Sequence, residues 1–595
     1  MSQFININSQ LDALRMKEFE KKFYERISDD VKIVPKVTPF KGINIDLMCV
    51  KDNKILFVKF MDTSEELFSI LDEELIEVMN EEFNLLRLKM AQHHNNISYN
   101  FVYIMPYVEI YDGYEFEDFV DNNIIDKNKL EQLIEKEISM EDYLKEENNE
   151  IELNMYILDI CPEYYVLNNQ MHINKEFKKI TFVSDDYEYS ATMLDENQLE
   201  KAISINYGNN LFRGGCGTGK TTIMLSRAVK LARVYPQHRF VVFVASKKLC
   251  NQLKESLEIL YKDNNNLEIH TISSFLFKLA KKFNLIADYR MFKQDYEKYL
   301  NNLIKQARNV VKNKNMFKGI FIDEAESFKY DEIKFISEFL YKTKNIFDIY
   351  YCNALNMTND LNIFKNNRQD LEFDDIIDLD INYRQNKNLV EFVNRFCQNS
   401  NDYIKSLRPM VEGDIYLFTK PIHKSGQDPE IIKATDLEEQ IESILWEIDF
   451  LLNKKGLNYS DIAIVYPYNK KKLKNGKTIY FQYILRKALE EAKIPYMIAE
   501  DEITKLTKKV GITISNIYGI KNLEYKAVIF CELEMLYNQT IGDTRQDYQI
   551  NDFVGDLNKI YLAVNIPTDY LKIITTFSED ASEIIKILIK SKWWK

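Results

Sequence analysis

The sequence predicts an α/β protein in which two units with parallel sheets follow an amino-terminal α/β region. From about Met193, strand-like and helix-like segments alternate, which is typical of parallel strands joined by crossover helices. A second alternating series begins near Ile377. A glycine-rich loop over residues 214–221 lies directly after the first strand of the first series.

The two series can be followed strand by strand. The first contains the strand-like runs NNLFRG, FVVFVAS, GIFIDEA and FDIYYCN, separated by helical segments. The second contains DIAIVYPY, VGITISNIY, KAVIFCELE and YLKIITTF. We therefore expect two α/β units over residues 193–376 and 377–595, joined to the amino-terminal region (1–150) by a connecting segment (151–192).

The amino-terminal region has patterns of its own. A charged amphipathic helix is expected from Ala13 to Ile27, followed by strands Asn44–Val50 and Lys54–Phe60 that meet at the turn residues Asp52-Asn53. The remaining expected elements are a long acidic helix over about 64–92, a strand in NISYNFVYIMPYVEI, an acidic helical segment over 128–153, and short strands at MYILDI and KKITFV.

Composition limits the class of protein. Hydrophobic residues make up 46% of the chain, which is enough for packed cores. The first residues are charged and no stretch of 18 apolar residues occurs, so we expect a soluble cytoplasmic protein without a membrane span. The net charge of −14 argues against binding nucleic acid through an overall basic surface, but it allows a local basic groove. The seven cysteines lack metal-ligand spacing, so we expect buried thiols.

The glycine-rich loop matches the pattern G-x-x-x-x-G-K-[ST] between a strand and a helix. Its glycines let successive backbone N–H groups curl around phosphates, and the helix N-terminus adds partial positive charge. Lys220 is expected at the β- and γ-phosphates, and the Thr221 hydroxyl is expected on Mg²⁺. The residues expected to bind the nucleotide here are Gly214, Gly217, Gly219, Lys220, Thr221 and Thr222.

An acidic pair follows the strand in GIFIDEAES. Because the carboxyl edge of a parallel sheet lies beside the loop, Asp323 is expected to hold Mg²⁺ and Glu324 to activate the attacking water. A simple surface pair is the alternative, and it fits poorly directly after an apolar strand.

In their order and spacing, these motifs resemble those of superfamily-one helicases of the UvrD/Rep kind, from about residue 193 to 577. The resemblance implies two RecA-like lobes that use ATP and Mg²⁺. It also implies roles for Gln198 of LDENQ at the adenine, Arg384 of LDINYR at the γ-phosphate, and Glu524 of GIKNLE at the ribose. FVVFVASKKLCNQL resembles a segment that touches single-stranded DNA, and IHTISSF resembles the T-x-x-S-F element.

The chain departs from that family at three motifs. Where the family has G-D-x-x-Q, this chain reads CNALN from Cys352 to Asn356. Asn522 replaces a glycine, and Ile566 stands where a second arginine finger belongs. Because such a finger is worth about 10³–10⁵ in rate in other NTPases, we expect ATP binding but slow hydrolysis.

The stretch GINIDLMCVKDNKILFVKF resembles the nuclease-related domain of the NERD type and the PD-(D/E)xK nuclease fold. Asp46 and Lys59 match the family's aspartate and lysine, with Glu18 or Glu20 on the preceding helix. Phe57 replaces a metal-binding glutamate, and a phenyl ring cannot ligate Mg²⁺. We expect a nuclease-like fold without nuclease activity, although Asp46 is equally explained as a strand-end acid.

Two functions are consistent with these motifs. The first is an ATP-dependent DNA helicase or translocase that acts on single-stranded or partly unwound DNA in DNA processing, repair or phage defence. The second is a nucleotide-gated switch or scaffold that controls a partner protein, contacted through the amino-terminal domain. Two basic stretches, QARNVVKNKNMFK and NKKKLKNGK, are candidates for phosphate contact or solvated faces, and Trp593-Trp594 for base stacking or burial.

Overall fold

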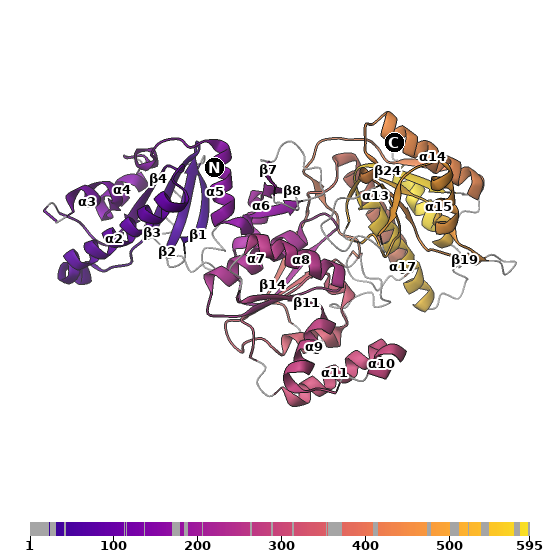
Figure 1. Cartoon of the computed structure of the whole chain (residues 1–595), viewed down its shortest axis with the longest axis horizontal. Helices are drawn as coiled ribbons and strands as arrows, with labels where there is room; N and C mark the ends of the chain where they lie inside the picture. The colour runs from indigo at the N-terminus through magenta and orange to yellow at the C-terminus, as the bar shows by residue number, and fades with distance from the viewer. Residues whose placement is uncertain are drawn as a thin grey trace.

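The chain folds into an amino-terminal mixed sheet, a small three-stranded sheet and two six-stranded parallel sheets (Figure 1). The predicted α/β class with two parallel sheets is thus confirmed. This computed structural model describes residues 23, 31–40, 43–111, 113–114, 116–135, 137–168, 179–183, 188–204, 206–261, 265–286, 289–311, 315–352, 354, 372–407, 414–472, 478–499, 511–521, 523–536, 547–575 and 583–592.

The amino-terminal sheet has the order β1-β2-β3-β4-β5, with the first three strands antiparallel and the last three parallel. The predicted hairpin is confirmed: Asp52 and Asn53 have φ of 46° and 58°, which a tight turn between the second and third strands requires. The strands are β1 (Lys32–Phe40), β2 (Ile43–Lys51), β3 (Lys54–Phe60), β4 (Tyr99–Ile104) and β5 (Ile124–Ile125).

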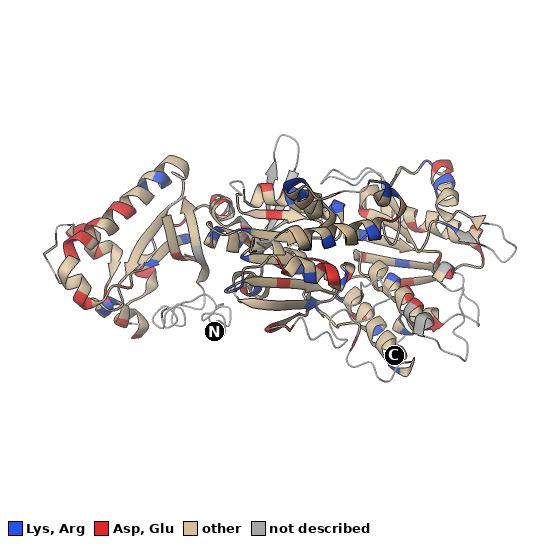
Figure 2. Ribbon diagram, turned by 90° about the horizontal axis from the view of Figure 1, so that it is seen from below, with Lys and Arg blue, Asp and Glu red and all other residues tan. Residues whose placement is uncertain are grey.

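The long predicted helix is α2 (Glu65–His93), which begins where the Ser64 hydroxyl accepts a hydrogen bond from Leu67 N at 3.3 Å. Acidic residues crowd this helix at one end of the molecule (Figure 2). α3 (Glu117–Asn123) follows the fourth strand. Of the helix expected at Ala13–Ile27, only Phe23 is described, and it is helical and buried.

The predicted helical segment over 128–153 is confirmed in part, because it is divided into α4 (Lys127–Glu135), a short 3-10 turn and the start of α5 (Glu150–Ile160). The predicted strand at MYILDI is wrong. MYILDI lies within α5 and is not a strand. A short apolar run fits either structure, and here Leu153, Tyr156 and Ile157 bury one helical face. The connecting sheet follows, with β6 (Tyr165–Asn168), β7 (Lys179–Val183, as predicted) and β8 (Glu188–Met193).

The first parallel sheet has the order β11-β10-β12-β13-β9-β14. Its strands are β9 (Gly208–Gly214), β10 (Phe240–Phe243), β11 (Leu267–His270), β12 (Gly319–Ile322), β13 (Ile346–Tyr351) and β14 (Asp375–Leu379). The second series was expected to begin near Ile377, but β14 pairs with β9 and completes the first sheet. A strand directly before a lobe boundary carries no sequence mark of the sheet it joins.

The helices of the first lobe are α6 (Glu196–Ile203), α7 (Lys220–Val234), α8 (Lys247–Leu260), α9 (Ile272–Phe283), α10 (Tyr289–Gln294), α11 (Tyr296–Val310) and α12 (Tyr330–Ser337). Of these, α11 packs against α9, and α10 packs against α11 at the edge of the lobe (Figure 1). Arg227 of α7 donates to Asp348 of β13 at 2.9 Å, and both side chains are fully buried. Losing one partner of a buried pair leaves an uncompensated charge, so this contact ties α7 to the sheet.

The second parallel sheet has the order β17-β24-β23-β18-β22-β21. Its strands are β17 (Glu430–Lys433), β18 (Ile462–Tyr466), β21 (Tyr496–Ile498), β22 (Ile512–Asn516), β23 (Tyr525–Phe530) and β24 (Pro567–Thr575). Its helices are α13 (Lys387–Leu407), α14 (Leu437–Asn453), α15 (Phe481–Glu491), α17 (Asp547–Val564) and α18 (Glu583–Lys592). Two further pairs of short strands are present. β15 (Ile381–Asn382) pairs with β16 (Lys420–Pro421), and β19 (Lys471–Lys472) pairs with β20 (Thr478–Ile479).

The amino-terminal sheet and the two parallel sheets lie one after another along the molecule, with the first parallel sheet in the middle (Figure 1). One hydrophobic core runs from the amino-terminal sheet through α5 to α7, so these parts pack together without a solvated gap. No helix in the described part of the chain is long and apolar enough to span a bilayer. All seven cysteines are buried free thiols.

Candidate nucleotide-binding site

The glycine-rich loop connects β9 to α7, as predicted. Gly217 and Gly219 have φ of 75° and 78°, a region that residues with a Cβ rarely adopt. Space is also short, because a Cβ on Gly217 would lie 2.9 Å from Asn382 Oδ1 and one on Gly219 would lie 2.8 Å from Gln198 Nε2. Both conformation and packing therefore require glycine in this loop.

Lys220 begins α7 and its ammonium group is held at the loop. Its Nζ donates to the carbonyl oxygens of Gly214 at 3.0 Å and Gly215 at 2.6 Å. The Thr218 hydroxyl also donates to Gly215 O, at 2.9 Å. Thr222 follows in the first turn of the helix. The cation thus lies where the loop's backbone curls, which is the position that phosphate binding requires.

Thr221 and Asp323 are brought together from residues far apart in the chain. The Thr221 hydroxyl donates to Asp323 Oδ2 at 2.6 Å, at the carboxyl end of β12. Burial and the neighbouring Glu324 carboxylate raise the pKa of Asp323 to about 6. Hydroxyl and carboxylate oxygens are the ligands that Mg²⁺ prefers, so this pair fits the expected metal.

Glu324 follows Asp323 in a left-handed conformation, with φ of 51°. Lys521, in the loop between β22 and β23, lies 3.4 Å from Glu324 Oε1 and 3.6 Å from Glu326 Oε1. Burial disfavours the lysine's charge, but the two carboxylates outweigh it and raise the pKa of Lys521 above its ordinary value. Glu326 also accepts from Cys352 N at 3.1 Å.

Gln198 lies against the loop from α6. Asp195 caps that helix by accepting from Gln198 N at 2.8 Å, and it also accepts from the Tyr383 hydroxyl at 3.0 Å. Tyr383 N in turn donates to Gly217 O at 2.8 Å. An amide side chain and an aromatic ring therefore flank the same glycine, Gly219.

Arg384 and Glu524 are paired with each other. Arg384 Nε donates to Glu524 Oε1 at 2.5 Å, and Nη1 donates to the carbonyl oxygen of Asn565 at 3.1 Å. The resemblance assigns these two side chains to different ends of a nucleotide. Either role requires the Arg384–Glu524 pair to separate or to turn.

Ile566, which stands at the position expected for the second arginine finger, lies in an apolar environment. Ile566 is 1% exposed and packs in the core of the second lobe with Leu562 and Ile573. Its side chain is part of the folding core and contributes no charge to the site. In the altered motif CNALN, Asn353, Leu355 and Asn356 lie outside the described residues, as does Asn522.

Three further residues belong to the site and were not predicted from the sequence: Lys521, Tyr383 and Tyr561. Tyr561, on α17, accepts a hydrogen bond from Cys216 N of the loop at 3.0 Å. Lys521 and Tyr383 stand inside motifs already quoted, so their position was available from the sequence. Tyr561 had no such signal, because its contact joins residues 345 apart in the chain.

In the amino-terminal sheet, Asp46 and Lys59 lie on adjacent strands. Asp46 Oδ2 accepts from Phe60 N at 2.8 Å, and Lys59 Nζ pairs with Glu82 of α2 at 2.6 Å. Glu82, which sequence analysis did not single out, also accepts from the Tyr103 hydroxyl at 2.8 Å. Phe57 is fully buried. Glu18 and Glu20 lie outside the described residues.

Two family models match parts of this chain. Residues 166–358 match the family model of the type III restriction enzyme res subunit, and residues 377–502 match the UvrD-like helicase C-terminal domain. No curated protein matches. One solved structure, the C-terminal domain of a possible DNA helicase from Lactobacillus plantarum, is 12% identical with a TM-score of 0.22, and covers 34% of this chain and 92% of that one.

Both family matches are to helicase-type domains, and they cover the nucleotide loop and the start of the second lobe. The chain is therefore a helicase-like, ATP-binding protein. The predicted UvrD-like character is matched in the second lobe, whereas the first lobe matches a different helicase-type family. Neither match reaches residues 1–165.

Proposed function

We propose that this chain is an ATP-driven motor of the UvrD-like superfamily-one kind, which translocates along or unwinds DNA. The observation that carries the proposal is the Thr221–Asp323 contact at 2.6 Å, next to Glu324 and opposite Lys521 of the second lobe. A P-loop alone binds nucleotide, but an adjacent acid reached by a cation from the other lobe suits hydrolysis coupled to lobe movement.

Each residue has a separate task in this proposal. Thr221 and Asp323 hold Mg²⁺, which shields the phosphate charge when bound. Lys220 and the backbone N–H groups of the loop bind the phosphates. Glu324 accepts a proton from the attacking water. Gln198, with Tyr383 beside it, binds the adenine, and Glu524 binds the ribose.

Arg384 reaches the γ-phosphate only after it leaves Glu524. The exchange of one anion for another gives the lobes a means of sensing ATP, because the arginine's partner changes from a second-lobe carboxylate to the nucleotide. Since Ile566 adds no charge, Arg384 and Lys521 are the two cations through which this proposal links the second lobe to hydrolysis. A lysine ammonium lacks the planar fork of hydrogen-bond donors of an arginine, so ATP turnover is slow if Lys521 takes the place of the second arginine finger.

A switch or scaffold is the second candidate. The buried Ile566 and the Arg384–Glu524 pair favour it, because both weaken the contact that drives hydrolysis. In that case ATP would close the lobes and change the affinity for a partner protein, with little turnover.

For the amino-terminal part we propose a nuclease-related fold that lacks cleavage chemistry and recruits a partner. The sheet order, with three antiparallel strands and then two parallel ones, supports the likeness. Lys59 is paired with Glu82, and Phe57 supplies no metal ligand. We propose domain divisions at 150 and 192, and a third directly after Leu379, because β14 belongs to the first lobe. A role in DNA repair or phage defence, and a cytoplasmic location, remain part of this proposal.

One experiment separates the two functions: ATP binding and steady-state ATP turnover, each with and without single-stranded DNA. A motor shows turnover that the strand stimulates. A switch binds ATP with comparable affinity and shows turnover that the strand does not change. If ATP does not bind, both candidates are wrong.

A further inference from the structure

The long helix α2 carries apolar side chains on two sides. Its inner side belongs to the core of the amino-terminal part and consists of Phe68, Ile76, Met79, Leu86 and Met90. A second group, the outer apolar set, is 45–74% exposed and consists of Leu67, Ile70, Val78, Leu85 and Leu88. A surface helix of a globular protein ordinarily has one apolar side and one polar side. The outer apolar set is therefore not explained by the folding of this chain.

The outer apolar set is aligned along the helix. α2 departs from helical geometry at Leu71, which has φ of −127°. Beyond Leu71, the residues Val78, Leu85 and Leu88 are spaced by seven and by three, which places them on one side of the helix. The other two members lie in the turns before Leu71. The set spans about 32 Å at the rise of an α-helix, at the end of the molecule far from the two parallel sheets (Figure 1).

The same helix is acidic over most of its length. Residues 65–86 include eight Asp or Glu and no Lys or Arg. Glu74 and Glu81 are exposed and stand four residues before and three residues after Val78, so both lie next to the outer apolar set. Glu77, which is exposed too, precedes Glu81 by one helical turn. Exposed apolar side chains beside carboxylates are complementary to apolar side chains flanked by Lys or Arg.

Two other occupants of this surface are less suitable. A second copy of α2 would bring two rows of carboxylates together, and neighbouring like charges are destabilising. Phe23, which precedes β1, packs on Phe60 with the ring centroids 5.6 Å apart. Successive side chains of a strand point to opposite faces of a sheet, and Lys59 is on the face that meets Glu82 of α2. Phe23 therefore packs on the face of the sheet opposite α2.

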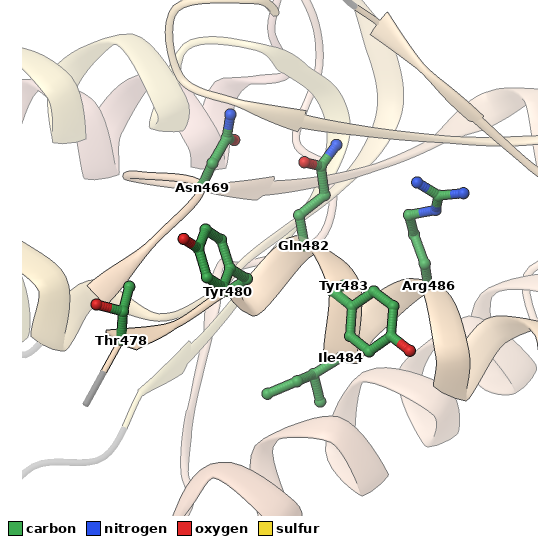
Figure 3. Close-up of a pocket in the computed structure, with 7 residues that line it drawn as sticks. All are labelled: Asn469, Thr478, Tyr480, Gln482, Tyr483, Ile484 and Arg486. Carbon is green, nitrogen blue, oxygen red and sulfur yellow. The ribbon is translucent and has the colours of Figure 1, made fainter. Parts of the chain in front are cut away.

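The groove on the second lobe is a poorer match to a basic, apolar partner. It has a volume of about 530 Å³ and lies beside the start of α15 (Figure 3). Of the described residues that line it, Ile484 is the one aliphatic residue, and the one charged residue, Arg486, would repel Lys and Arg. The outer side of α2 instead combines exposed aliphatic side chains with negative charge.

We propose that the outer side of α2 is the docking surface for a basic, amphipathic helix of a partner protein. The apolar side chains of that helix pack on the outer apolar set, and its Lys or Arg side chains lie beside Glu74, Glu77 and Glu81. Burial of apolar surface from both proteins drives the association, and the charges select the partner and orient it. The inference rests on the proposed recruiting role of the amino-terminal part, for which it names the surface and the chemistry of the partner.

The test uses the full-length protein and a fluorescent synthetic peptide of about 21 residues, which as a helix spans about 32 Å. Leucine occupies the a and d positions of its heptads and lysine occupies the others. One control peptide has the same composition in shuffled order, so that its leucines do not share one side of a helix. A second control peptide has glutamate in place of lysine. Anisotropy measures the affinity for each peptide.

We expect the leucine–lysine peptide to bind, and V78A/L85A/L88A to weaken its binding at least about tenfold, because central apolar contacts carry most of the affinity at interfaces. Alanine favours helix, so α2 keeps its structure in this variant. E74K/E77K/E81K should reverse the preference, so that the glutamate peptide binds more tightly than the lysine peptide. Ile286→Ala, at an aliphatic residue 76% exposed on the first lobe, is the matched control.

Equal affinity of V78A/L85A/L88A, I286A and wild type for the leucine–lysine peptide would overturn the inference and assign recruitment to another surface. Equal binding of the shuffled peptide, or the absence of binding by the wild type, would overturn it too. A wild-type dimer that V78A/L85A/L88A converts to monomers in sedimentation velocity would show that a second copy covers the surface. Failure of the proposed motor gives a different result, because peptide binding persists while single-stranded DNA does not stimulate ATP turnover. Thermal melting checks that each variant is folded.

Discussion

Lys521 Nζ lies 3.4 Å from Glu324 Oε1 and joins the second lobe to the acidic edge of the first. It also donates to the Ser327 hydroxyl at 3.1 Å. A lysine so placed brings a positive charge of the second lobe next to the proposed base. It also moves with the second lobe, so the environment of the proposed base depends on whether the lobes are closed.

Lys521→Ala is therefore expected to lower ATP turnover at least about tenfold, in line with the loss of one cation from a charged reaction centre. Lys521→Arg should retain part of the rate. The matched control is Lys526→Ala, which removes a similarly buried lysine 3.3 Å from Asp461 in the same lobe. Equal turnover in Lys521→Ala and Lys526→Ala would exclude a catalytic contribution from Lys521.

Lys220→Ala is expected to weaken ATP binding about 10- to 100-fold, the worth of a charge-assisted contact with phosphate. The fold should be retained, because the lysine's present partners are carbonyl oxygens of its own loop. Isothermal titration with ATP measures the affinity, and thermal melting measures the fold. An unchanged affinity would contradict the assigned role.

Arg384→Ala is expected to reduce turnover about 10³-fold while ATP affinity changes only a few-fold. The variant leaves Glu524 without its arginine, so Arg384→Lys distinguishes loss of charge from loss of geometry. Arg213→Ala, which removes an exposed pair with Asp378, is the control. If Arg384→Ala hydrolyses ATP at the wild-type rate, the arginine does not contact the γ-phosphate.

Ile566→Arg is expected to destabilise the protein and not to restore a second finger. Ile566 is 1% exposed, and a charge introduced there would be buried without a partner. We expect a lower melting temperature and no gain in turnover. A stable, faster variant would mean that this loop can turn the side chain towards the nucleotide.

Much of the fold could be predicted because the strongest patterns are local. The hairpin at Asp52-Asn53 and the loop before Lys220 each depend on a few neighbouring residues with particular backbone conformations. The prediction of a strand at MYILDI was wrong because a short apolar run is compatible with either a helix or a strand. The assignment of β14 to the second sheet was wrong because its sheet is decided by pairing with β9, which is far away in the sequence.

In the candidate site too, some features could be predicted from local motifs and others depend on packing between distant parts of the chain. The P-loop residues and the acid Asp323 follow from motifs, and their contact at 2.6 Å follows from parallel-sheet geometry. The pairing of Arg384 with Glu524, and the burial of Ile566, depend on how the second lobe packs. No local sequence pattern indicates such packing. The position of the second arginine finger could therefore be identified in the sequence, but its burial could not be predicted.

The full-length protein is expected to show no metal-dependent cleavage of DNA, because Phe57 provides no oxygen ligand and Lys59 is paired with Glu82. Incubation of plasmid and linear DNA with Mg²⁺ or Mn²⁺, without ATP, tests this expectation. Cleavage that disappears in Asp46→Ala would show that the amino-terminal part is an active nuclease.

ATP turnover by wild type and Glu324→Gln, with and without single-stranded DNA, tests whether the acidic edge beside the P-loop drives a motor. We expect the strand to stimulate the wild type. We also expect Glu324→Gln to lose turnover by at least about 100-fold while it still binds ATP, because only the general base has been removed. Wild-type turnover that is negligible with and without the strand, or a Glu324→Gln variant as fast as the wild type, would contradict the proposed motor.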